Sequence, residues 1–260
     1  GQGATCVPGR KVNNMQVIMK SDIGRMRKVN QDYVRCYQKS DHECLVVLCD
    51  GMGGHNAGEI ASQMACDDII ENYQQQESLT DTSQIHDWIL SAIQHAHMIV
   101  ESKSHESQEF EGMGTTIVLV LCIHDNIYIS HVGDSRVYWV TDEFIQLTRD
   151  DTLVNVLVDS GTISQAEARF HPQKNILLQA VGVSDSLNPS FLEKQINDGF
   201  LLVCSDGLYN SLSDEQMMNI LHAQEDIETR ASQLMDAANT YGGQDNISFA
   251  LILTKGVVNL

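Results

Sequence analysis

The sequence predicts an α+β fold, a β-sandwich with helices packed on its outer faces. Strand-like and helical segments alternate in blocks instead of forming regular βαβ units. Two strand-like segments, residues 45–49 and 200–204, are continuous apolar runs, as a sheet covered on both faces requires. With 260 residues, 42% of them hydrophobic, the chain can bury the core of one large domain.

The predicted elements follow from residue type and spacing. Val, Ile, Leu and aromatic residues predict strands over residues 15–20, 33–37, 44–50, 115–124, 127–132, 137–141, 200–205 and 246–254. Apolar residues three and four apart predict helices over 57–75 and 84–103. Ser213 begins a Ser-Asp-Glu-Gln capping box that leads into a helix over 217–222, and a second short helix is predicted over 228–240.

Two segments stand apart from this pattern. Residues 1–14 lack periodicity and are interpreted as a tail, either disordered or left over from expression, before a single domain over residues 15–260. The interval from about 149 to 181 predicts an inserted helical flap, with Ser164 as a helix N-cap and a turn at His171-Pro172. An ordinary surface connection with short helices explains that interval equally well.

Acidic residues follow the apolar runs at their exit ends. Asp50-Gly51 follows residues 45–49, Ser205-Asp206-Gly207 follows residues 200–204, and Asp245 comes directly before the last predicted strand. Mg²⁺ and Mn²⁺ favour carboxylates and backbone carbonyls, and Gly51 lets its own carbonyl approach an ion without a Cβ in the way. A single Asp-Gly pair is more often only a turn. Convergence of all three strand ends would make an oxygen-ligand metal site.

Charge and cysteine usage exclude several classes of protein. The net charge of −19, from 35 acidic and 16 basic residues, argues against nucleic acid or an anionic membrane as the main partner. Bound divalent cations would reverse that field locally for an anionic substrate. Seven cysteines without a Cys-x-x-Cys pair indicate core residues in a reducing, cytoplasmic compartment. No apolar run approaches the ~20 residues that span a bilayer, and no secretory signal is expected.

A series of motifs then becomes recognisable, in one order along residues 17–254. On these motifs the chain resembles the PP2C-type metal-dependent serine/threonine protein phosphatases, in their compact bacterial form. The motifs are Ser21-Asp22-Ile23-Gly24 with Arg27 and Asn30-Gln31-Asp32; Asp50-Gly51-Met52-Gly53-Gly54-His55; Gly114-Thr115-Thr116; His131-Val132-Gly133-Asp134-Ser135-Arg136; Leu147-Thr148-Arg149-Asp150-Asp151; Ser205-Asp206-Gly207; and Asp245-Asn246.

The resemblance implies a four-layer α-β-β-α sandwich, two central antiparallel sheets flanked by helices, with a metal centre at one end. It implies two Mn²⁺ or Mg²⁺ ions, with Asp50 bridging both, the Gly51 carbonyl binding one, and Asp206 and Asp245 completing the other. Asp134 resembles the residue that, with Asp206, holds a weaker third ion in bacterial members.

Further roles are implied for residues around those ligands. Asp32 would hydrogen-bond water at the metals, and Arg27 matches the phosphate-binding arginine. Two cations would activate a shared water for in-line attack at phosphorus without a covalent phosphoenzyme. Gly114-Thr115-Thr116 is assigned a structural role, and the segment from Gly133 to Arg136 would otherwise be interpreted as a hairpin turn.

Two positions depart from the family pattern. Met52 stands where family members with Asp-Gly-His carry the general acid, so His55 is a candidate acid, directly or through water, or else a solvent-facing loop residue. Gln31 stands where many members carry Glu, which removes a charge and weakens any metal contact there.

The predicted function is hydrolysis of phosphoserine and phosphothreonine in proteins, by a monomer that acts on the substrates of a cognate Ser/Thr kinase. The motifs of P-loop NTPases, dinucleotide-binding proteins, α/β-hydrolases and zinc proteases are missing. Two alternatives stay open. The chain could be a pseudophosphatase that serves as a binding or regulatory module, or a phosphatase dedicated to one signalling phosphoprotein. Substrate choice is expected to depend on the flap.

Overall fold

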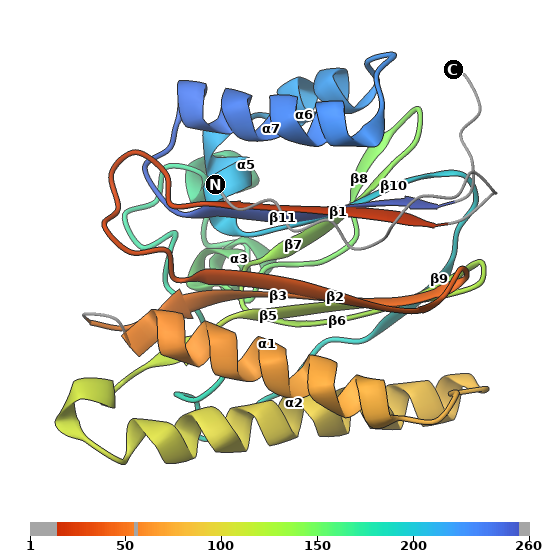
Figure 1. Ribbon diagram of the computed structural model, residues 1–260. Coiled ribbons are helices and arrows are strands. Elements are labelled where there is room, and N and C mark those ends of the chain that lie inside the picture. The colour runs from red at the N-terminus through yellow and green to blue at the C-terminus, as the bar shows by residue number, and fades with distance from the viewer. Residues whose placement is uncertain (1–14, 55–56, 255–260) are drawn as a thin grey trace.

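The computed structural model describes residues 15–54 and 57–254, so the predicted tail over 1–14 lies outside the described residues. Two antiparallel sheets pack face to face, and helices cover their outer faces (Figure 1). The strand order of the first sheet is β1 (Gln16–Asp22), β11 (Ile247–Thr254), β10 (Gly199–Cys204), β7 (Arg136–Val140) and β8 (Phe144–Gln146). The order of the second is β2 (Asp32–Ser40), β3 (Glu43–Met52), β5 (Ile117–Ile123), β6 (Asn126–Val132) and β9 (Leu192–Gln195), with β4 (Gly114–Thr115) paired to the end of β3.

The helices form the two outer layers. The second sheet is covered by α1 (Ala57–Gln75) and α2 (Thr82–Ser104), and the first by α5 (Asp206–Ser211), α6 (Asp214–Leu221) and α7 (Ile227–Tyr241) (Figure 1). Three shorter elements complete the chain: a 3₁₀ turn at Gln108–Phe110, α3 (Leu153–Asp159) and α4 (Gln165–Ala168). The predicted four-layer α-β-β-α sandwich is confirmed.

Strand β3 shows why a strand in this position is apolar throughout. Leu45, Val47 and Cys49 face α1 and α2, whereas Val46 and Leu48 face the core between the two sheets. A third core lies between the first sheet and α5–α7. Because a strand alternates its side chains between faces, and both faces of β3 are covered, every position must be apolar.

Most predicted elements are found within a few residues of their predicted bounds. Helix α1 spans the predicted 57–75, and the capping boxes at Ser164 and Ser213 are both formed. The sequence analysis missed β8 and β9, which are short strands at the sheet edges, and the six-residue helix α5. Such short elements carry too few residues to show a period.

The segment from Gly133 to Arg136 has a different role from a hairpin turn. It joins β6, in the second sheet, to β7, in the first, so the hairpin interpretation is wrong. Gly133 has φ 104°, and a Cβ there would lie 2.7 Å from the side chain of Thr116. The crossing between sheets therefore carries Asp134 to the end of the sandwich, beside the exit of β3.

Candidate active site

Five carboxylates meet at one end of the sandwich, where the strands supply them from both sheets. Asp32 and Asp50 are register partners at the ends of β2 and β3. Asp206 begins α5 directly after β10, and Asp245 precedes β11, the neighbour of β10. Burial raises the pKa of Asp50 well above its usual value, and the charges of Asp32, Asp206, Asp134 and Asp245 raise it further. The predicted strand ends thus do converge.

Asp32 is the most enclosed of these carboxylates, with 5% of the residue exposed. Its Oδ2 accepts a hydrogen bond of 2.7 Å from Ser205 Oγ, whereas its Oδ1 is buried without a partner among the described residues. Burial raises its pKa to about 7, the serine hydrogen bond opposes that shift, and the charge of Asp206 adds to it. A buried acceptor left open at this point suits water at a metal centre, as predicted.

A network of buried polar groups holds Asp32 in place. Ser205 Oγ accepts from the backbone N–H of Ser248 at 3.1 Å, and Ser248 Oγ lies 2.7 Å from Ser21 Oγ. Asn30 donates from Nδ2 to Ser21 Oγ at 2.8 Å and accepts from the backbone N–H of Asp32 at 3.1 Å. The sequence analysis assigned no role to these serines, because they are brought together only by the pairing of β1, β10 and β11.

Arg27 lies at the rim of the carboxylate cluster. Its Nη2 donates to Asp245 Oδ2 at 2.9 Å, and 51% of its side chain is exposed. The pKa of Asp206 is raised by burial and by Asp245 to about 6, and the charge of Arg27 acts in the lowering direction. The guanidinium is therefore close to both carboxylates and still open to a ligand from solvent.

Asn246 fixes the loop that carries Arg27. Its Nδ2 donates to the carbonyls of Ile23 and Val29, each at 2.9 Å, and its Oδ1 accepts from the backbone N–H of Gln31 at 2.9 Å. One amide side chain thus ties the segment from residue 23 to residue 31 against the start of β11. Because Asp245 is its neighbour, the same contacts set the position of Arg27 relative to that carboxylate.

The two Asp-Gly pairs are close-packed backbone sites, not turns. A Cβ on Gly51 would lie 1.9 Å from the carbonyl oxygen of Gly58, at the start of α1. A Cβ on Gly207 would lie 1.9 Å from the carbonyl oxygen of Asn246. Thr116 adds two contacts to Asp50, accepting from its N–H at 3.1 Å and donating its own N–H to its carbonyl at 2.8 Å. The structural role predicted for this threonine segment fits these contacts.

Asp134 connects the cluster to the predicted flap. Burial, followed by the charges of Asp206 and Asp150, raises its pKa to about 8. Two residues on, Arg136 holds Asp150 in a bidentate pair, with Nε to Oδ1 at 2.9 Å and Nη2 to Oδ2 at 2.7 Å. The same guanidinium lies 3.6 Å from the ring centroid of Tyr209. The first turn of the flap is therefore anchored beside Asp134.

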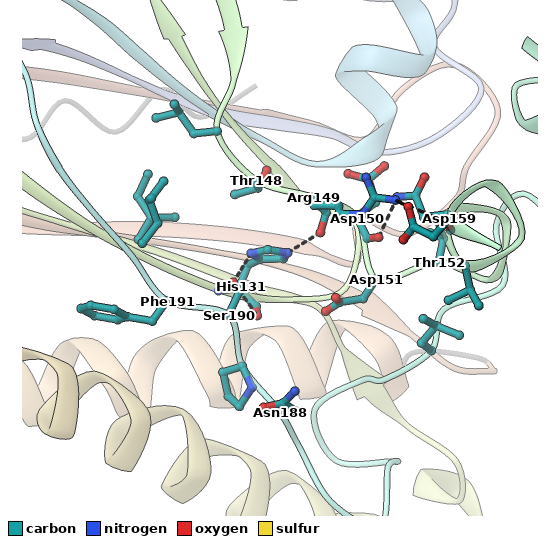
Figure 2. Close-up of a pocket in the computed structure, with 17 residues that line it drawn as sticks. His131, Thr148, Arg149, Asp150, Asp151, Thr152, Asp159, Asn188, Ser190 and Phe191 are labelled. Atoms are coloured by element: carbon teal, nitrogen blue, oxygen red, sulfur yellow. Dashed lines mark hydrogen bonds and ion pairs between the residues drawn. The ribbon is translucent and has the colours of Figure 1, made fainter. Parts of the chain in front are cut away.

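His131 holds the flap segment from the other side, in a pocket of about 530 Å³ (Figure 2). Its Nε2 lies 2.7 Å from the carbonyl oxygen of Arg149, and its Nδ1 contacts the hydroxyl of Ser190. Arg149 and Ser190 lie before and after the interval that contains α3 and α4. A single buried histidine of β6 therefore contacts both ends of this interval.

The cluster suits a hard divalent cation by its ligand chemistry. All its side-chain donors are oxygens, and one buried oxygen of Asp32 is left open. Within residues 15–54 and 57–254, no three His, Cys, Asp or Glu side chains already surround one point. The carboxylates are close enough to repel one another, but they do not yet surround one point as metal ligands do. A bound cation would draw them together.

The two departures from the family pattern have different outcomes. Met52 lies at the end of β3, opposite Gly114, and carries no group that can donate a proton. His55 lies outside the described residues, so its role as an acid stays a prediction. Gln31 donates from Nε2 to the carbonyl of Gly53 at 3.4 Å, and its amide lies where a Cβ on Gly58 would stand.

Comparison with known proteins decides the family. The family model for protein phosphatase 2C matches residues 25–248. The chain belongs to the protein phosphatase 2C family. A putative protein phosphatase 2C-type protein of Streptococcus pyogenes is 37% identical over 240 residues, which cover 92% of this chain and 97% of the relative.

Solved structures of related phosphatases have the same fold as this chain. The serine/threonine phosphatase of S. agalactiae superposes with a TM-score of 0.87 at 36% identity, covering 92% of this chain and 99% of that one. The catalytic domain of the phosphatase PstP, in complex with two manganese ions, matches with a TM-score of 0.79 at 29% identity, covering 93% and 99%. The chain is a metal-dependent protein serine/threonine phosphatase.

The raised carboxylate pKa values predict how metal-free protein responds to pH. Above pH 4 the folded state keeps protons that the unfolded chain has released, on Asp206 up to about pH 6, on Asp32 up to about 7 and on Asp134 up to about 8. The contribution of this cluster to stability is therefore present at low pH and lost as pH rises through about 6 to 8. We expect Mn²⁺ to raise the melting temperature more at pH 8 than at pH 5.5.

The measurement is thermal unfolding in EDTA and in Mn²⁺ across that range. Asp50→Asn, which removes one of the repelling charges, should flatten the pH dependence of the metal-free protein. A metal-induced shift that is equal at both pH values would contradict the assignment.

Proposed function

We propose that Asp50, the Gly51 carbonyl, Asp206 and Asp245 hold two Mn²⁺ or Mg²⁺ ions, and that Asp134 contributes with Asp206 to a weaker third site. The gathering of these side chains from both sheets at one end supports the assignment. When bound, such ions activate water and neutralise phosphate charge. The observation that carries the proposal is the convergence of these carboxylates at the ends of strands from both sheets, because their repulsion is costly without a cation.

Arg27 is proposed to hold the phosphate of the substrate. Its planar guanidinium matches two phosphate oxygens, and half of its side chain is accessible. In the present structure it pairs with Asp245, so phosphate binding exchanges one anionic partner for another. The exchange costs less than desolvating a free arginine, and it orients the phosphorus for attack from the carboxylate side.

Asp32 is proposed to orient the attacking water. Its Oδ2 is fixed by Ser205, so the open Oδ1 has one direction in which to accept. A fixed acceptor aligns one water proton and leaves a lone pair toward the substrate. His55 remains the candidate for protonating the leaving serine or threonine oxygen, since Met52 cannot.

A pseudophosphatase is the weaker alternative. A binding module gains nothing from five carboxylates gathered at one point, four of which have a pKa raised by burial and by neighbouring charge. A phosphatase dedicated to one signalling phosphoprotein differs from a general one only in the surface around the site, where the flap lies. We propose a monomer that reverses the action of a cognate Ser/Thr kinase.

The state of the cysteines bears on the cellular compartment that we propose for the protein. The described cysteines are all free thiols, and most are buried in the cores, which supports the proposed cytoplasmic location. No helix in the described part of the chain has the length and apolarity to cross a membrane.

The test is phosphate release from a phosphothreonine peptide, in Mn²⁺ and in EDTA. We expect release only with Mn²⁺, and its collapse in Asp206→Asn. No release from folded, Mn²⁺-loaded wild type, on this peptide and on an aryl phosphate, would support the binding module instead.

A further inference from the structure

Free positive charge is rare on this acidic protein, and its distribution is uneven. Most lysines and arginines of the described residues have ion-pair partners, namely Lys20, Arg27, Arg35, Lys39, Lys103, Arg136 and Arg149. Arg230 is also engaged, by the carbonyl of Leu221 and the ring of Phe200. Over residues 15–54 and 57–254, the lysines and arginines with neither an ion-pair partner nor the contacts of Arg230 are Arg25, Lys28, Arg169, Lys174 and Lys194.

Arg25 and Lys28 lie on the loop that carries Arg27. The backbone N–H of Arg25 donates to the carbonyl of Gly243 at 2.7 Å, and its Cγ would lie 3.0 Å from a Cβ on that glycine. Its side-chain stem therefore rests two residues from Asp245. Both cations are exposed, and they flank the arginine that is proposed to hold the phosphate.

Arg169 and Lys174 lie at a second edge of the site, beside Asp134, where α4 ends and the chain continues. Both line a groove of about 540 Å³ that also contains Asp134, so the groove is continuous with the carboxylate cluster. The same groove is also lined by Asp214 and Glu215, at the start of α6. Arg149, at the base of the same segment, pairs with Asp159, which offsets its charge (Figure 2).

Charge on both rims has a consequence for substrate choice. The protein as a whole repels anions, with a net charge of −19. A peptide that carries carboxylates on either side of its phosphorylated residue would find unpaired cations on both rims of the site. Cations at a rim that have no ion-pair partner are the feature that recognises such a peptide.

Resting on the proposed function, we propose that Arg25 and Lys28 on one rim, and Arg169 and Lys174 on the other, select phosphopeptides that carry acidic residues beside the phosphorylated residue. The pair on the loop acts more strongly, because the flap pair shares its groove with Asp214 and Glu215. Lys194 lies on β9, which Figure 1 places at the far end of the sandwich from the loop between β1 and β2. Substituting Lys194 therefore controls for the loss of an unpaired positive charge at a position far from the site.

The experiment uses two phosphothreonine peptides of equal length. One has Asp and Glu at the second and third positions on each side of the phosphothreonine, and the other has Asn and Gln there. Exposed ion pairs contribute little individually, so we expect a preference in kcat/KM of about 3- to 30-fold for the acidic peptide at low salt. Added salt should reduce that preference, because the contacts are exposed.

Three variants assign the preference to residues. Arg25→Gln with Lys28→Gln, and Arg169→Gln with Lys174→Gln, should each lower the ratio of acidic to neutral kcat/KM. Lys194→Gln should leave it at the wild-type value. Circular dichroism and melting temperature confirm that each variant is folded.

The outcomes separate this inference from the proposed function. Equal hydrolysis of both peptides by wild type would overturn the inference and leave the phosphatase intact. A preference that survives both double variants, or falls equally in Lys194→Gln, would overturn the assignment to these rims. No hydrolysis of either peptide would overturn the proposed function and the inference with it.

Discussion

Replacing Asp50 by asparagine is expected to lower metal-dependent kcat/KM by about 100-fold or more, since a bound cation contributes several kcal/mol to such a transition state. Asn keeps the shape and one oxygen of Asp50 but removes the charge that would bridge the cations. The other carboxylates reach the site from separate strands, so no neighbouring side chain replaces it. Mn²⁺ affinity, measured by calorimetry, should fall together with activity.

Loss of activity through misfolding is separable from loss of the ligand. Burial and four neighbouring carboxylates disfavour charge on Asp50, so the metal-free variant should melt at or above the temperature of the metal-free wild type at pH 8. Asp41→Asn, an exposed position at the opposite end of the β2–β3 pair, controls for the substitution itself. An inactive variant that melts well below wild type, or an active one with wild-type Mn²⁺ affinity, would contradict the prediction.

These expectations describe a site whose carboxylates lower the stability of the metal-free folded state. Buried carboxylates are normally paired with a cation, whereas burial and neighbouring carboxylates raise the pKa of Asp32, Asp50 and Asp134. Stability is supplied elsewhere, by three apolar cores on both faces of both sheets. Surplus stability in the layers is what allows charge repulsion to be concentrated at one end.

The apolar runs made the layers predictable from the sequence. Residues 45–49 and 200–204 have no polar position, and only a strand covered on both faces explains that. The site was predictable in part for the same reason, since Asp50 and Asp206 come where these runs stop. The spacing of these aspartates along the chain does not show that they converge in space. That prediction depended on the family resemblance until the strand pairing was known.

Other contacts of the site depend on neighbours far away in the chain. Ser205 meets Asp32 across 173 positions, and Asn246 meets the carbonyl of Ile23 across 223. No local pattern distinguishes such residues from ordinary serines and asparagines near strand ends. The hairpin alternative for residues 133–136 was wrong for a related reason, because a turn within one sheet and a crossing between sheets use the same residue types.

Gly207 supports the second large prediction. The sequence analysis associated Gly51 with access of its carbonyl to an ion, and the structure shows close backbone packing at both Gly51 and Gly207. Alanine at Gly207 would improve helix propensity by about 1 kcal/mol in α5. Its Cβ would also lie 1.9 Å from the carbonyl oxygen of Asn246 and 2.9 Å from the carbonyl carbon. Both are backbone atoms, which cannot move aside as a side chain would.

The clash should outweigh the propensity, so we expect Gly207→Ala to lower the free energy of unfolding by about 1 to 3 kcal/mol. Relief requires α5 to move away from the start of β11, which separates Asp206 from Asp245. Mn²⁺ affinity should therefore fall even under conditions where the variant is fully folded. Calorimetric Mn²⁺ titration and urea unfolding measure the two effects.

Gly54→Ala is the matched control, because a Cβ there meets no atom within 4 Å and its change in stability should stay within about 0.5 kcal/mol. If Gly207→Ala loses stability but binds Mn²⁺ like wild type, the close approach of α5 and β11 supports the fold without setting the distance between Asp206 and Asp245. If both properties fall together, the absence of a side chain at Gly207 sets the separation of Asp206 and Asp245, the two proposed metal ligands.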